Sequence, residues 1–191
     1  MKTQKYTALS FFLVAVITIG TLTGCFHKMA PSSPAAGTYN DSANKTVYTV
    51  APWGAVTLPG KWMPGKYNKS SQQQYYYRDD TTTLTVVIAP CKNQPYAKGG
   101  LTGYDFVKKS FEIESRYQVQ LLEQTPRLLV QDSANRYMIW TVRQDGIDQY
   151  FLCGVKDCTC NECSYRSFNL RNRRLTEAVA IKLLQDVFFA D

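Results

Sequence analysis

The second half of the chain is divided into short runs of β-branched and aromatic residues, separated by only a few turn-forming residues. The clearest turn is Asp145-Gly146, a pair that favours the two-residue turn of a β-hairpin. Connections this short can join only antiparallel neighbours, because a parallel crossover needs a dozen or more residues. The predicted strands of this half are Val119–Glu123, Arg127–Gln131, Tyr137–Arg143, Ile147–Val155 and Tyr165–Leu170.

Similar runs appear earlier, with Pro59-Gly60 and Asp79-Asp80 as the punctuating turns. Within one of them stands the triplet Tyr75-Tyr76-Tyr77. Successive side chains of a strand point to opposite faces, so the three rings cannot form a single binding surface, and we expect them to pack across strands. The predicted strands of this half are Val47–Val50, Ala55–Leu58, Gln73–Arg78 and Thr82–Ala89.

Helical spacing of apolar residues appears twice. One helix is predicted from Gly103 to Tyr117 with Thr102 as its N-cap, and a second from Glu177 to Phe188 capped by Thr176. An antiparallel sheet with two amphipathic helices indicates an α+β sandwich in a single domain, residues 46–191. The predicted core-facing residues are Phe106, Ser110, Ile113 and Tyr117, with Val107 and Phe111 beside them, and Val179, Ala180, Leu183, Leu184, Val187 and Phe188.

The first 24 residues have the form of a secretory signal: a basic start, an apolar segment from Ala8 to Gly20, and small residues before a cleavage point. Leu22-Thr23-Gly24-Cys25 resembles the bacterial lipobox, in which the peptidase cuts before a diacylated cysteine. Lipidation is therefore expected at Cys25, and two or three acyl chains would anchor the protein firmly. The segment 25–45 is rich in Pro, Ser, Ala, Gly and Asn, and we interpret it as a flexible tether.

Cleavage would leave 167 of the 191 residues and remove Lys2 and Lys5, which lowers the formal net charge from +7 to +5. Phe26 follows the cysteine, whereas an aspartate there resembles an inner-membrane retention signal, so the outer membrane is favoured. We expect a cell-envelope protein facing the periplasm, with the membrane as partner through the anchor and an envelope protein as a second partner. Export makes nucleic acid an improbable ligand.

Val56-Thr57-Leu58-Pro59-Gly60-Lys61-Trp62 resembles the short strand, proline and tryptophan that open PsbP-like domains. The order of elements is also similar: strands, a central helix, a meander, and a C-terminal helix introduced by Arg174-Leu175-Thr176-Glu177. The family includes photosystem II extrinsic proteins, a Ran-binding import factor and many bacterial lipoproteins. The resemblance implies an αβα sandwich that acts as a non-enzymatic binding or accessory module. It transfers no functional residue to this chain.

An odd number of cysteines remains once Cys25 is lipidated, and three interpretations stay open. Export favours disulfides, for example Cys153 with Cys163 across a hairpin. The closely spaced thiolates could instead hold a tetrahedral zinc ion, or all could remain reduced. A dithiol redox role is disfavoured, because Cys160-Asn161-Glu162-Cys163 lies in a predicted turn and not at a helix N-terminus. The candidates for disulfide or metal binding are Cys91, Cys153, Cys158, Cys160 and Cys163.

No catalytic arrangement is visible. The single histidine, His27, lies in the predicted tether, which excludes a Ser-His-Asp or Cys-His nucleophile from the folded domain. There is no Walker-type loop and no dinucleotide fingerprint. Arg171, Arg173 and Arg174 could contact a phosphate or a lipid headgroup, although a solvated strand end is the favoured interpretation. We therefore predict a binding module without cofactor; the alternative is a metal-binding or redox protein that uses the Cys153–Cys163 turn.

Overall fold

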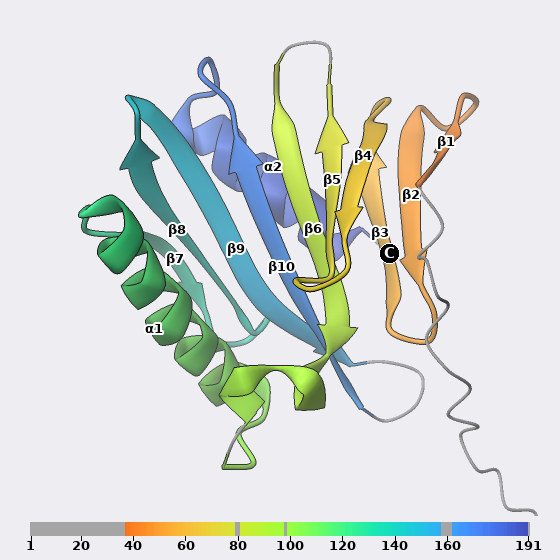
Figure 1. Cartoon of the computed structure of the whole chain (residues 1–191). Coiled ribbons are helices and arrows are strands. Elements are labelled where there is room, and N and C mark those ends of the chain that lie inside the picture. The colour runs from red at the N-terminus through yellow and green to blue at the C-terminus, as the bar shows by residue number, and fades with distance from the viewer. Residues whose placement is uncertain (1–36, 79–80, 98, 158–161, 191) are drawn as a thin grey trace, which may run out of the picture.

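A seven-stranded antiparallel sheet forms the centre of the molecule, with strand order β4-β5-β6-β10-β9-β8-β7, and a three-stranded sheet, β1-β2-β3, lies beside it (Figure 1). The computed structural model describes residues 37–78, 81–97, 99–157 and 162–190. Its strands are β1 (Thr38–Asn40), β2 (Lys45–Val50), β3 (Gly54–Pro59), β4 (Met63–Asn68), β5 (Gln73–Tyr77), β6 (Thr83–Pro90), β7 (Arg127–Asp132), β8 (Tyr137–Gln144), β9 (Ile147–Asp157) and β10 (Cys163–Arg171). Its helices are η1 (Cys91–Asn93), η2 (Pro95–Ala97), α1 (Gly103–Leu122) and α2 (Glu177–Phe189).

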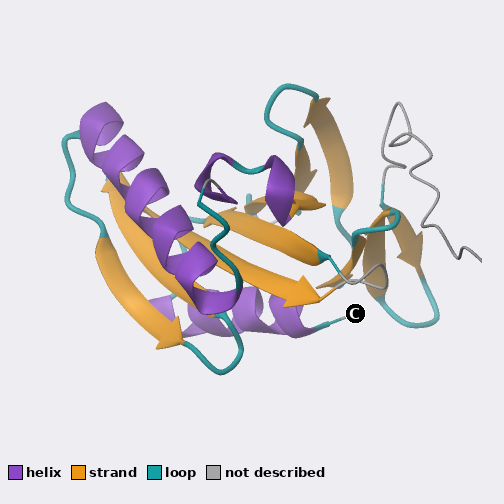
Figure 2. Ribbon diagram, turned by 90° about the horizontal axis from the view of Figure 1, so that it is seen from below, coloured by secondary structure: helices purple, strands orange, loops and turns teal. Residues whose placement is uncertain are grey.

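The two α-helices lie on opposite faces of the large sheet (Figure 2). Helix α1 packs on β8 and β9, whereas α2 packs on β9, β10 and the edge strand β3 of the small sheet. The fold class predicted from the sequence, α+β with an antiparallel sheet and two amphipathic helices, is confirmed. The meander of β7 to β10 is also confirmed, and its Asp145-Gly146 turn has positive φ at both residues, as a tight hairpin turn of this kind requires.

The main core fills the space between the large sheet, α2 and the small sheet. Alternate residues of β8, β9 and β10 point into it, and α2 adds four buried apolar side chains, the last of them Phe188. Gly154 of β9 allows α2 to approach closely, because a Cβ atom there would lie 2.6 Å from the Phe188 ring. Thr176 caps α2 as predicted, since its side chain accepts a hydrogen bond from the backbone N–H of Val179.

The segment that resembles the start of a PsbP-like domain forms the corner between the two sheets. Thr46 Oγ1 donates to the carbonyl of Gly60 and accepts from the backbone N–H of Trp62, both at 3.0 Å. The indole N–H of Trp62 donates to the carbonyl of Pro59 at 2.9 Å. The corner therefore satisfies its own polar groups while the indole remains 2% exposed in the core.

Three elements differ from the sequence prediction. Helix α1 continues to Leu122, so the predicted strand Val119–Glu123 is wrong. Strand β4 lies in a segment to which no strand was assigned, because Pro64 and Gly65 are typical strand breakers; as an edge strand with an irregular register it tolerates both. Strand β1 lies within the segment 25–45 that was interpreted as a tether, which places Gly37–Lys45 in the folded domain.

Candidate functional site

The cysteines were the leading sequence candidates for chemistry, and the structure joins Cys91 to Cys163 in a disulfide with a Cα–Cα distance of 5.4 Å. This bond connects the start of η1, directly after β6, with the start of β10. The suggested pair Cys153–Cys163 is wrong, because strand register places Cys163 opposite Asp157 and Cys153 opposite Ser167. The bond therefore fixes the strand ends at which the helical connection to α1 begins.

Cys153 is a free thiol that is fully buried beneath α1, where its Sγ lies 3.9 Å from the carbonyl oxygen of Val107. Burial raises the pKa of the Cys153 thiol, so the thiolate form is disfavoured and the residue is a weak nucleophile. Cys25, Cys158 and Cys160 lie outside the described residues. Among the residues that are described, no group of three or more His, Cys, Asp or Glu side chains is arranged as a metal site.

A carboxylate is held between two tyrosines at the inner side of α1. Glu114 Oε1 accepts hydrogen bonds from the hydroxyl groups of Tyr96 and Tyr165, each at 2.6 Å, and Ser110 Oγ lies 3.2 Å from the Tyr165 hydroxyl. Burial raises the pKa of the Glu114 carboxyl, and the two hydrogen bonds oppose part of that rise. Burial also raises the pKa of Tyr165.

This polar cluster has a structural role, since it joins α1 to η2 and β10 around a set of aromatic rings. With every hydroxyl hydrogen-bonded and the nearby Cys153 protonated, the cluster offers no activated nucleophile. Sequence reasoning missed Glu114. A signal was present, because Glu114 follows the buried Val107 by seven residues and so lies on the same side of the helix.

The far end of α1 extends beyond its contacts with the sheet. Val107, Glu114 and Leu121 follow one another at seven-residue intervals and therefore lie on the same side of the helix, the side that faces the core in its first half. Leu121 is nevertheless 57% exposed. Tyr117 is also 57% exposed and Ile113 37%, so the prediction that Ile113 and Tyr117 pack on the core is wrong. We call Ile113, Tyr117 and Leu121 the α1 overhang.

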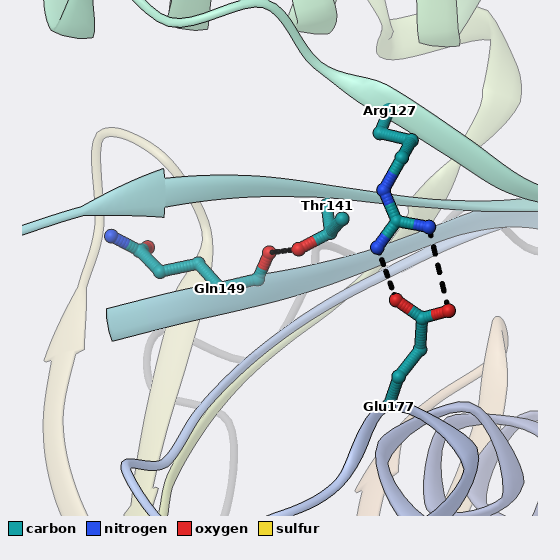
Figure 3. Close-up of polar contacts among 4 residues, drawn as sticks. All are labelled: Arg127, Thr141, Gln149 and Glu177. Atoms are coloured by element: carbon teal, nitrogen blue, oxygen red, sulfur yellow. Dashed lines mark hydrogen bonds and ion pairs between the residues drawn. The ribbon is translucent and has the colours of Figure 1, made fainter. Parts of the chain in front are cut away.

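The edge strand β7 begins a few residues after α1 ends, and an ion pair joins its first residue to α2. Arg127 of β7 and Glu177 of α2 form a bidentate ion pair, and on the adjacent strands Thr141 Oγ1 donates to the carbonyl of Gln149 at 2.8 Å (Figure 3). Arg127 is therefore already neutralised. The apolar α1 overhang precedes this paired arginine in the chain. Leu128, the residue after Arg127, is 37% exposed.

The opposite end of the large sheet has an open face. The main contacts of α1 are with β8 and β9, and on this side of the sheet neither α-helix lies over β4 or β5 (Figure 1). Tyr76 points away from this face and is fully buried, which confirms that neighbouring tyrosines face opposite sides; Tyr75 and Tyr77 share the open one. Strand register aligns Met63, Tyr77, Thr83 and Arg171 in one row and Tyr75, Thr85 and Asn169 in the next.

Two hollows lie along this open face. One is lined by Lys66, Tyr67, Asn68, Lys69, Tyr75 and Tyr77, and the other by Thr81, Thr83, Ile147, Arg171, Asn172 and Arg173. Tyr77 lines the first and Thr83 the second, and these two residues are cross-strand partners. Among the described residues, none of the four cations that line these hollows, Lys66, Lys69, Arg171 and Arg173, forms an ion pair. The stretch from Ser42 to Arg78 has no acidic residue and has five basic residues: Lys45, Lys61, Lys66, Lys69 and Arg78.

No protein-family model matches the sequence, and no curated protein matches it significantly. Within the described residues, no helix is both long enough and apolar enough to cross a bilayer.

Proposed function

We propose that the protein is a lipid-anchored accessory module of the bacterial cell envelope, without enzymatic activity, which holds a protein partner through the α1 overhang. The observation that carries this proposal is the exposure of Leu121. The inner side of α1 is buried in its first half, at Phe106, Val107 and Ser110, whereas Leu121 is 57% exposed, so the end of the helix presents apolar surface to another protein.

The energetics of the overhang suit a partner interface. Covering a leucine or similar side chain contributes roughly 1.5–3 kcal/mol, and tyrosine is among the residues that most often dominate binding energy. Tyr117 and Leu121 lie one helical turn apart, so a single apolar groove or helix on the partner could cover both. The partner that fits is an envelope protein with an apolar concave surface.

The proposed location depends on the lipobox at Leu22-Thr23-Gly24-Cys25, followed by Phe26 and not by an aspartate. The Cys91–Cys163 disulfide is compatible with an oxidising compartment. We therefore place the protein at the outer membrane, facing the periplasm, with acyl chains such as palmitate on Cys25. A PsbP-like domain is supported by the helices on both faces of the sheet and by the Pro59-to-Trp62 corner.

Mass spectrometry of the native protein tests the anchor. We expect the mature chain to begin at Cys25 with acyl chains attached, and a Cys25→Ala variant to lose its membrane association. An unmodified cysteine, or a chain that keeps residues 1–24, would refute the anchor while leaving the partner surface untouched.

Site-specific crosslinking in cells tests the partner. A photoreactive phenylalanine analogue in place of Tyr117 should give one discrete adduct with an envelope protein, and Leu121→Lys should abolish it. The matched control is Val179→Lys, since Val179 of α2 is also a half-exposed apolar residue on a helix, and the adduct should persist. No adduct at position 117, or an adduct that Leu121→Lys leaves unchanged, would exclude the α1 overhang as the docking surface.

A further inference from the structure

We infer that the open face of the large sheet binds an anionic polysaccharide chain, with the sugar rings on Tyr75 and Tyr77 and the charged groups in the two hollows. This site is separate from the α1 overhang and does not depend on the function proposed above. The α1 overhang belongs to a helix that packs on β8 and β9, whereas the rings and the two hollows belong mainly to β4, β5, β6 and the end of β10.

The open face has the mixture of groups that sugars require. Tyr77 is 40% exposed and Tyr75 is half-buried, so each presents ring surface against which the C–H face of a sugar can pack. Thr83 and Thr85 supply hydroxyl groups on the neighbouring strand, and Asn169 supplies an amide on the next. Aromatic rings with interspersed neutral donors and acceptors can recognise sugar hydroxyls along a row.

The charge distribution selects an anionic chain. Each hollow contributes two cations, Lys66 and Lys69 in one and Arg171 and Arg173 in the other. No ion pair within the described part of the chain neutralises them, in contrast to the paired Arg127 and Arg136. Carboxylate or phosphate groups at two points of a polymer would therefore meet the cations while its sugars crossed the Tyr77–Thr83 pair.

A bilayer surface fits the same charges less well. The rings of the open face lie beside hollows and are partly buried, whereas a flat membrane needs protruding apolar groups, of which this face offers mainly Met63 and Tyr77. A second peptide strand is also disfavoured, since Pro64 lacks a backbone donor and Lys66 stands on the exposed edge strand. An extended anionic glycan is the ligand that uses the rings, the hydroxyl groups and the cations together.

Gly65 positions the Tyr77 ring. A Cβ atom on Gly65 would lie 2.2 Å from Cε2 of Tyr77, so the ring rests directly on the backbone of β4. Only glycine allows this contact, and the ring is held against the sheet before any ligand binds. Gly65→Ala should therefore displace the ring without removing any group that touches the sugar, which makes Gly65 a positioning residue.

Isothermal titration calorimetry measures the binding of the protein, purified in detergent micelles, to four probes: a hexasaccharide of uronic acids, a phosphorylated mannan oligosaccharide, a neutral mannan hexasaccharide and inorganic polyphosphate. We expect one of the two anionic glycans to bind at least tenfold more tightly than the neutral one. The carboxylate and phosphate probes identify the anion. Polyphosphate measures binding by charge alone.

The variants separate stacking from charge. Tyr77→Ala and Gly65→Ala should each weaken glycan binding roughly tenfold, the scale of one lost aromatic stacking contact, while polyphosphate binding stays unchanged. Arg171→Gln should weaken both, and Tyr117→Ala on the α1 overhang should weaken neither. Thermal unfolding checks that each variant folds, and Tyr77→Phe, which keeps the ring, should bind as the wild type. Failure of both anionic glycans to bind, binding of polyphosphate alone, or indifference to Tyr77→Ala would overturn the inference.

Discussion

Removal of the Cys91–Cys163 disulfide should cost a large part of the stability of this domain. The bond closes a loop of 72 residues, and the chain-entropy relation for a loop of that length gives about 4 kcal/mol of stabilisation at 25 °C. A domain of this size is stable by only about 5–15 kcal/mol, so this one bond accounts for a large share.

Urea unfolding of the Cys91→Ser/Cys163→Ser double variant measures the effect. With a slope of about 2 kcal/mol per molar urea, a loss of 4 kcal/mol lowers the unfolding midpoint by about 2 M. Unfolding should be followed by tryptophan fluorescence, because Trp62 and Trp140 are both buried. Wild-type protein treated with a reductant should reproduce the variant, which separates the loss of the bond from any packing effect of serine.

The reasoning would be refuted by a double variant whose midpoint falls by less than about 0.5 M, because that is about 1 kcal/mol on the same slope. A matched control is Cys153→Ser. It removes a buried thiol that takes no part in the bond, so its cost comes from burying a hydroxyl group and should be insensitive to reductant.

Three further substitutions test other parts of the fold. Glu114→Gln should flatten the dependence of stability on pH. Because the pKa of Glu114 is raised in the folded state, its contribution to the free energy of unfolding is complete below about pH 4, near the pKa of an unperturbed glutamate, and is lost as the pH rises through the folded-state pKa. Urea unfolding across a pH series would reveal this difference. Gly154→Ala should destabilise by about 1–3 kcal/mol because the new methyl group meets the Phe188 ring, and a melting temperature equal to that of the wild type would contradict this. Arg127→Ala should cost less than about 1 kcal/mol, since the pair with Glu177 is exposed; a larger loss in chemical denaturation would show that the pair is more than a surface contact.

The meander and the helices could be predicted because their signals are local. The Asp145-Gly146 turn, the apolar runs of β8 and β9 and the periodicity of α2 each depend on residues close together in the chain. The end of α1 could not be predicted in this way. Its last turns continue a helix past the sheet, and the β-branched Val119 within them favours a strand by propensity alone.

The disulfide, the open face and the Glu114 cluster could not be predicted from the sequence, because each depends on contacts between distant parts of the chain. The pairing of Cys91 with Cys163 depends on β6 and β10 being neighbours, although 72 residues separate the two cysteines. The open face likewise joins Tyr77 to Arg171 through Thr83, three residues from three strands that only the sheet brings into line. The hydrogen bonds of Glu114 depend on where η2 places Tyr96.

The strand order has a consequence for how such a protein would act as a crosslinker. Seven strands at a spacing of about 4.8 Å separate β4 from β7 by roughly 29 Å, which is the widest gap that the sheet could leave between a ligand on β4 and a ligand beside α1, the helix on β8 and β9. A polymer captured at the β4 edge and a protein captured at the α1 overhang would each raise the effective concentration of the other. The width of one sheet would then set the gap between two components of the envelope.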